Sequence, residues 1–149
     1  YIAVPFTSHV DKEGVAEESF VEFINEIDST VKELKFSTYI AYRDFFKWGK
    51  ITFNPDTVFE KFKLELESAK VVLAVNPNEG TSTNLILGIS AALKKDIVIL
   101  LNHQFEKESL VGLMYQGLKN MTNTTVIFYT DINDLKIKLR RTLKKYSRS

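Results

Sequence analysis

The sequence predicts an α/β protein built around a mostly parallel sheet, and two observations support this fold class. Continuous apolar runs at residues 71–75 and 96–101 are typical of strands that are covered on both faces. Between such runs lie stretches in which apolar residues recur at helical spacing, for example Phe20, Ile24 and Ile27. A chain that alternates strands with helices in this way joins its strands through right-handed crossovers and makes them parallel.

Each element is expected from its local pattern. We expect five strands, at residues 1–6, 36–42, 71–75, 96–101 and 124–129. We also expect five helices. Four lie at residues 15–34, 55–69, 84–94 and 109–119, and the fifth follows an N-cap at Asp131 or Asn133. The second strand is expected because its residues are β-branched and aromatic. Asn54 followed by Pro55 is typical of a helix start, with Asn as the N-cap. The expected architecture is a flavodoxin-like, Rossmann-like three-layer sandwich of strand order 2-1-3-4-5, in one domain over residues 1–149.

The composition excludes several kinds of chemistry. The chain has no Cys, which excludes disulfides, thiolate zinc sites and Cys nucleophiles, and His9 and His103 are too few for a His-rich metal centre. The net charge of +1 argues against a strongly basic nucleic-acid binder. No apolar run approaches the roughly 20 residues that span a bilayer. We therefore expect a cytoplasmic protein without a metal or other cofactor, and without a nucleic-acid or membrane partner.

In sheets of this kind, ligands bind at the carboxyl ends of the strands, near the point where the strand order reverses. The loops at residues 5–14, 43–53 and 76–84 are therefore the candidates for a site. The third loop leaves a buried strand and enters a helix, where backbone N–H groups and the helix dipole favour an anion. Its Thr81, Ser82 and Thr83 add hydroxyl donors, and Gly80 allows close approach. The same residues also suit an ordinary helix cap, and both interpretations stay open.

The residues of the other two loops indicate a particular ligand less clearly. Arg43 and Trp48 could clamp a planar base or a carboxylate, or Arg43 could pair with Asp44 while the tryptophan packs over the sheet edge. The first loop supplies Ser8 and His9. No G-x-S-x-G motif surrounds this serine, and two adjacent loop positions do not suit a catalytic triad.

Several segments, in order, resemble the nucleoside 2-deoxyribosyltransferase-like superfamily, which includes nucleotide N-glycoside hydrolases and TIR-like relatives. They are YIAVPF at residues 1–6, AYRDFFKWG at 41–49, SAKVVLAV at 68–75, GTSTNLILGISAAL at 80–93, and the core segments at 110–114 and 126–131. The resemblance implies a nucleoside, nucleotide or related ligand and a homo-oligomer such as a homodimer, with Met114, Tyr115 and Gln116 facing a partner subunit. Together, the loops and the resemblance give these candidate ligand-binding residues: Pro5, Phe6, Ser8, Arg43, Trp48, Gly49, Asn76, Gly80, Thr81, Ser82, Asn84 and Met114.

The chemistry of this superfamily depends on two carboxylates, and the matching positions of this chain are apolar. A Glu in the pattern E-[LI]-G-x-[AS] attacks or stabilises the anomeric carbon of the sugar. Here LGIS at residues 87–90 matches the second half of that pattern, and Ile86 stands at the Glu position. The assisting carboxylate of the preceding helix falls on Phe62. The resemblance thus implies a nucleotide-binding pseudoenzyme with lost or altered N-glycosidic bond chemistry.

Two alternatives stay open. A displaced acid, Glu79 in the third loop or Glu65 one turn beyond Phe62, could serve an active nucleoside deoxyribosyltransferase or nucleotide N-glycoside hydrolase. Alternatively, the chain could be a homo-oligomeric interaction module with a vestigial site.

Overall fold

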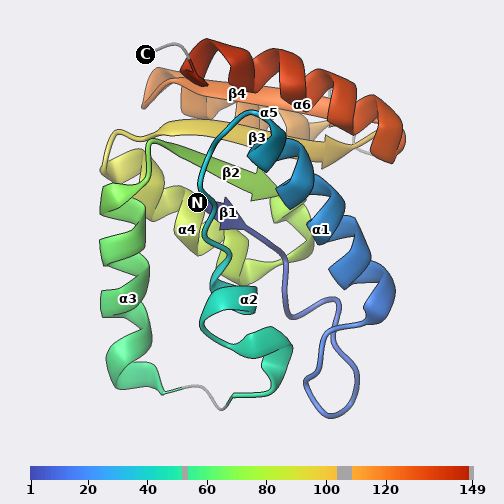
Figure 1. Cartoon of the computed structure of the whole chain (residues 1–149). Coiled ribbons are helices and arrows are strands. Elements are labelled where there is room, and N and C mark those ends of the chain that lie inside the picture. Colours follow the sequence, from blue (N-terminus) through green and yellow to red (C-terminus); the bar gives the residue numbers. More distant parts are fainter. Residues whose placement is uncertain (52–53, 104–108, 148–149) are drawn as a thin grey trace.

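The computed structural model describes residues 1–51, 54–103 and 109–147. In this part of the chain the sheet has four parallel strands in the order β1-β2-β3-β4 (Figure 1). They are β1 (Ile2–Ala3), β2 (Val71–Val75), β3 (Asp96–Asn102) and β4 (Thr124–Tyr129). The register places Leu73 of β2 between Ile2 of β1 and Val98 of β3. The parallel sheet expected from the apolar runs is therefore confirmed.

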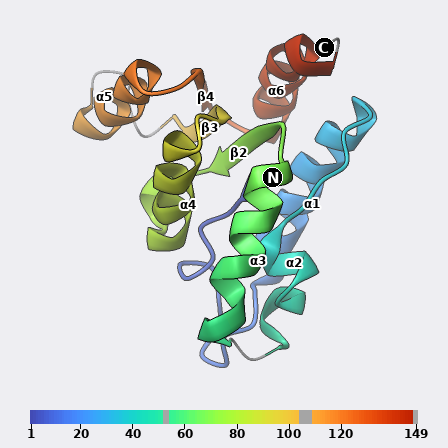
Figure 2. The same ribbon diagram turned by 90° about the vertical axis from the view of Figure 1, so that its left-hand side faces the viewer.

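Helices cover both faces of the sheet and produce three layers (Figure 2). They are α1 (Glu18–Glu33), α2 (Ala41–Asp44), α3 (Pro55–Ser68), α4 (Thr81–Ala92), α5 (Leu110–Gly117) and α6 (Ile132–Ser147), with the 3₁₀ helices η1 (Lys47–Gly49), η2 (Pro77–Glu79) and η3 (Leu118–Asn120). α1 and α6 share one core with Leu73 and Val75 of β2. α3 and α4 pack on the opposite face, over Val72 and Ala74, and α5 joins them there. Alternate residues of each strand thus face opposite helix layers.

The expected second strand does not form. None of residues 36–40 is paired as a strand, and α2 begins at Ala41. The carbonyl of Tyr39 accepts one hydrogen bond, 2.9 Å long, from the N–H of Ile2 in β1, at the place of the expected edge strand. The carboxylate of Asp44 binds the N–H of Ile40 and turns the chain into the helix. The sheet therefore has the order 1-2-3-4 over its described strands instead of the expected five-stranded order 2-1-3-4-5.

Buried polar contacts fix α2 against α1. Asp28 of α1 is only 5% exposed, and it accepts hydrogen bonds from the hydroxyl of Thr38 and the amine of Lys32. The guanidinium of Arg43 lies 2.9 Å from the same carboxylate and also binds Asp44. Burial acts to raise the pKa of Asp28, but the hydrogen bonds from Lys32 and Thr38 and the charge of Arg43 outweigh it and lower that pKa. This network positions the segment that carries Tyr42.

The helix starts agree with their local signals. The side chain of Asn54 accepts a hydrogen bond from the N–H of Asp56, so the expected N-cap of α3 is confirmed. Asp131 accepts the N–H groups of Asn133 and Asp134 at the start of α6. The helix after β2 begins at Thr81, three residues earlier than expected, so its N-terminus directly follows η2 and Gly80. Across the described ranges, we find no helix long and apolar enough to cross a membrane.

Candidate functional site

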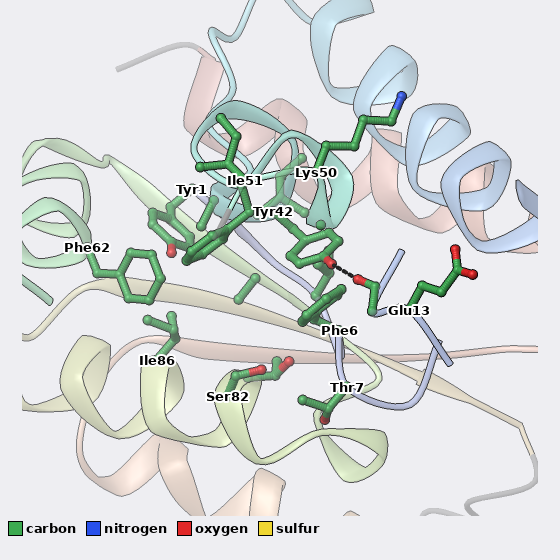
Figure 3. A pocket seen from close by; sticks show the side chains of 18 residues that line it. Tyr1, Phe6, Thr7, Glu13, Tyr42, Lys50, Ile51, Phe62, Ser82 and Ile86 are labelled. Atoms are coloured by element: carbon green, nitrogen blue, oxygen red, sulfur yellow. Dashed lines mark hydrogen bonds between the residues drawn. The ribbon is translucent and has the colours of Figure 1, made fainter. Parts of the chain in front are cut away.

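A cavity lined by residues of both β1 and α2 has a volume of about 550 Å³, which is within the size range of small-molecule sites (Figure 3). Its walls come from the first six or seven residues, from α2 and the turn that follows it, and from facing sides of α3 and α4. We call it the β1 cavity. The four wall segments are distant in the sequence, so the cavity exists only in the folded chain.

Aromatic rings form most of one wall of the β1 cavity. Tyr42 packs against Phe6 and Phe46, and Trp48 supports it from behind with its ring centroid 5.8 Å away. Phe46 in turn meets Phe62 edge-on at 6.3 Å. Burial raises the pKa of Tyr42 to about 12, so its hydroxyl stays protonated at neutral pH. That hydroxyl donates a hydrogen bond to the carbonyl of Gly14 in the first loop.

The polar side of the β1 cavity is the N-terminus of α4. Gly80 precedes this helix and supplies no side-chain cap, and Ser82 and Thr83 line the cavity. Thr83 is 1% exposed, and its buried hydroxyl has no hydrogen-bond partner among the described residues. Gly80 is required here because a Cβ at this position would lie 2.8 Å from the Cα of Pro5. A buried hydroxyl without a partner beside free helix N–H groups suits a ligand oxygen.

The two positions that match the family's carboxylates meet in this cavity. Phe62 of α3 and Ile86 of α4 both line it and pack in the same apolar cluster (Figure 3). Ile86 is only 5% exposed. Among the described lining residues, only the side chains of Glu13 and Lys50 carry charge; both are exposed, and their charged ends point away from the aromatic wall (Figure 3). The described residues therefore give the interior of the cavity hydroxyl groups and no carboxylate.

Some of the residues expected at a site gather here. Phe6, Gly49 and Ser82 line the β1 cavity. Trp48 packs against Tyr42 of the aromatic wall, and Pro5 lies against Gly80 at the N-terminus of α4.

Other expected residues lie elsewhere. Arg43 is engaged by Asp28 and Asp44, and it is not a lining residue of the cavity. Asn84 binds the carbonyls of Pro77 and Gly80 and accepts a hydrogen bond from Tyr115. Thr81 is exposed at the start of α4, and Met114 is 66% exposed on α5. Residues 52 and 53 of the expected second loop lie outside the described residues.

Glu79 lies in a separate cleft. Its carboxylate is 3.0 Å from Nε2 of His9, and both residues line a space of about 360 Å³ at the carboxyl ends of β2, β3 and β4. Asn76 lines the same cleft and has a left-handed backbone, with φ at 39°. The hydroxyl of Ser8 donates to the carbonyl of Glu79. Glu79 is not a lining residue of the β1 cavity.

Sequence reasoning missed Tyr42, Phe46 and Ile51 as lining residues, because it assigned Tyr42 to a strand and the other two to an undefined loop. The β-branched and aromatic composition on which the strand was predicted does agree with the burial of Ile40 and Tyr42. The described residues contain no group of three or more His, Asp or Glu side chains that could hold a metal ion.

Comparison with known proteins places this fold. No protein-family model matches the sequence, and no curated protein matches it. The solved structure of a CMP N-glycosidase from Clostridium botulinum, BcmB, is similar, with a TM-score of 0.69 and 18% identity over 95% of this chain and 98% of that one. The solution structure of BlsM is similar with a TM-score of 0.65 and 20% identity, over 97% of this chain and 91% of that one. This chain therefore shares its fold with BcmB and BlsM along almost its whole length, which agrees with the fold that the sequence resemblance implies.

Proposed function

We propose that this protein binds a nucleoside or nucleotide in the β1 cavity, and that its N-glycosidic bond chemistry is lost or altered. One observation carries the proposal. The two positions at which the superfamily resemblance expects carboxylates, Phe62 and Ile86, line one cavity and are both apolar. The shared fold with a CMP N-glycosidase supports a nucleotide-like ligand.

The walls of the cavity suit the parts of such a ligand. A nucleobase has two apolar faces and stacks on aromatic rings, which contributes about 1–3 kcal/mol per base. Phe6 and Tyr42 offer such rings. The sugar or phosphate oxygens would lie at the N-terminus of α4, where backbone N–H groups and the hydroxyls of Ser82 and Thr83 can donate.

The described residues that line the cavity do not include the groups that cleave the bond. Loss of a base leaves positive charge on the anomeric carbon, and a nearby carboxylate normally stabilises that charge or attacks the carbon. Neither Ile86 nor Phe62 can do this, and neither can transfer a proton to the leaving base. Glu13 is the one carboxylate among the described lining residues, and it points outward (Figure 3).

Isothermal titration calorimetry with CMP, NAD and ADP-ribose tests the proposal. We expect saturable binding of at least one of them at submillimolar concentration. Ile86→Trp should abolish binding by filling the cavity, whereas Leu85→Trp, at a 48% exposed neighbouring position, should not. No binding at millimolar ligand would exclude the proposed function.

Two other functions keep some support. An enzyme that uses Glu79 as a displaced acid would have to act in the separate cleft, where this carboxylate lies beside His9. Release of cytosine from CMP that disappears in Glu79→Gln would establish this enzymatic function.

The exposed apolar residues of α5 favour a homo-oligomer; they are Leu110, Leu113 and Met114. A monomeric mass in light scattering would exclude the homo-oligomer.

A further inference from the structure

We propose that Glu79 is a positioning residue. Together with His9 it forms a latch that holds residues 5–9 as a wall of the β1 cavity. The inference rests on the proposed function, because it describes how one wall of the ligand-binding cavity is held in place. This inference gives Glu79 a role that does not require contact with the ligand.

The Glu79 side of the latch is firmly anchored. The side chain of Asn76 accepts hydrogen bonds from the hydroxyl of Tyr129, at 3.0 Å, and from the N–H of Asn102, at 3.2 Å. The carbonyl of Asn76 accepts the N–H of Glu79 at 2.9 Å, which closes η2. Pro77 in the same turn is buried. Glu79 is therefore held by the carboxyl ends of three strands.

The loop side, residues 5–9, contacts η2, Gly80, the start of α1 and Tyr42. The ring of His9 stacks on Phe20 of α1, with centroids 4.4 Å apart, and its Nε2 reaches Glu79. Ser8 donates to the carbonyl of Glu79, and Pro5 abuts Gly80 just after it. The residues between these attachment points are Phe6 and Thr7, and both line the β1 cavity opposite the start of α4.

Several polar groups of the cleft already bind one another, which favours a latch over a second ligand site. Asp131 caps α6, the side-chain oxygen of Asn76 accepts two hydrogen bonds, and Glu79 is paired with His9. Among the described residues that line the cleft, the other ionisable side chain is that of Tyr129. Burial raises the pKa of Tyr129 to about 12, and it stays neutral.

Calorimetry with CMP tests the latch on the wild-type chain, Glu79→Gln and His9→Gln. Because the pair is partly exposed, we expect the affinity for CMP to be about two- to five-fold lower in either variant than in the wild type. Glu60→Gln, at an exposed position on α3, is the control and should behave like the wild type.

Amide hydrogen exchange of the ligand-free protein separates the two proposals. The N–H of His9 donates to the carbonyl of Phe6 and reports on the loop. It should exchange more slowly in the wild type than in Glu79→Gln. Equal exchange in the two proteins would overturn the latch, whatever CMP does. Slower exchange in the wild type without CMP binding would support the latch and remove the proposed function.

Discussion

At the scale of single residues, the chemistry of the β1 cavity depends on what stands at a few positions. Ile86 and Phe62 supply apolar surface where acid and nucleophile are expected from the superfamily resemblance. Thr83 supplies a polar group instead, a buried hydroxyl that has no hydrogen-bond partner among the described residues. Leaving such a group unsatisfied costs about 1–3 kcal/mol, so its presence points to a bound partner.

Thr83→Val tests that interpretation because valine has nearly the same shape and no hydroxyl. We expect the dissociation constant for CMP to rise by about three- to ten-fold, the value of one hydrogen bond. The melting temperature should not fall, because the hydroxyl has no partner in the described protein. Thr81→Val, at the exposed first residue of α4, is the control for both measurements. Unchanged CMP affinity in Thr83→Val would contradict the assigned role.

At the scale of elements, the wall around η1 depends on a close backbone contact. Lys47, Trp48 and Gly49 all have positive φ, which is a costly run for two residues with side chains. Gly49, at φ 89°, lies so close to the first loop that a Cβ there would be 2.2 Å from the carbonyl oxygen of Gly14. The glycine therefore allows η1 to seal the cavity against the first loop.

Gly49→Ala should lower the free energy of unfolding by about 1–3 kcal/mol and weaken CMP binding, because both the backbone strain and the contact with Gly14 worsen. Chemical denaturation and calorimetry measure the two effects. Gly88→Ala is the matched control, since a Cβ at that helical position meets nothing within 4 Å. It should be stabilising by up to about 1 kcal/mol. Equal stability of the two variants would be incompatible with the proposed contact.

The elements also show what the sequence can and cannot predict. Helices with a regular apolar face, such as α1 and α6, and the continuous apolar strands were predictable from local pattern alone. The segment at residues 36–42 was not, because its β-branched and aromatic residues report burial, as of Ile40 and Tyr42, and say nothing about backbone pairing. That pairing is replaced by the contacts of Asp28 and Asp44, which depend on the tertiary fold. The candidate loops followed from topology, whereas the aromatic wall needed the three-dimensional structure.

At the scale of the whole molecule, the cavity depends on how α2 is attached to the rest of the fold. Asp28 and Asp44 bind Arg43 and hold α2 on α1. Burial acts to raise the pKa of each aspartate, but hydrogen bonds and the Arg43 charge outweigh it and lower both. A lowered pKa means that these groups contribute stability above the unfolded-state value of about 3.9, and that this stability is lost as the pH falls through the folded-state value.

We therefore expect the free energy of unfolding to fall as the pH drops below about 4. Asp28→Asn should cost about 2–3 kcal/mol at pH 7 and show a shallower acid dependence, because it removes one of the carboxylates responsible. Urea denaturation at several pH values measures both slopes, with Glu60→Gln as the exposed control. An identical acid slope in Asp28→Asn would show that this network does not govern acid stability.

The central claim, binding of a nucleotide without cleavage of its N-glycosidic bond, is tested most directly by one nuclear magnetic resonance titration with CMP. The amide signals of the protein report binding, and the anomeric proton of the ribose reports the bond in the same sample. We predict saturable shifts at Phe6, Ser82 and Thr83 that are absent in Ile86→Trp, together with an anomeric signal that persists over days. Unshifted amide signals at millimolar CMP, or loss of the anomeric signal with release of cytosine, would contradict the account.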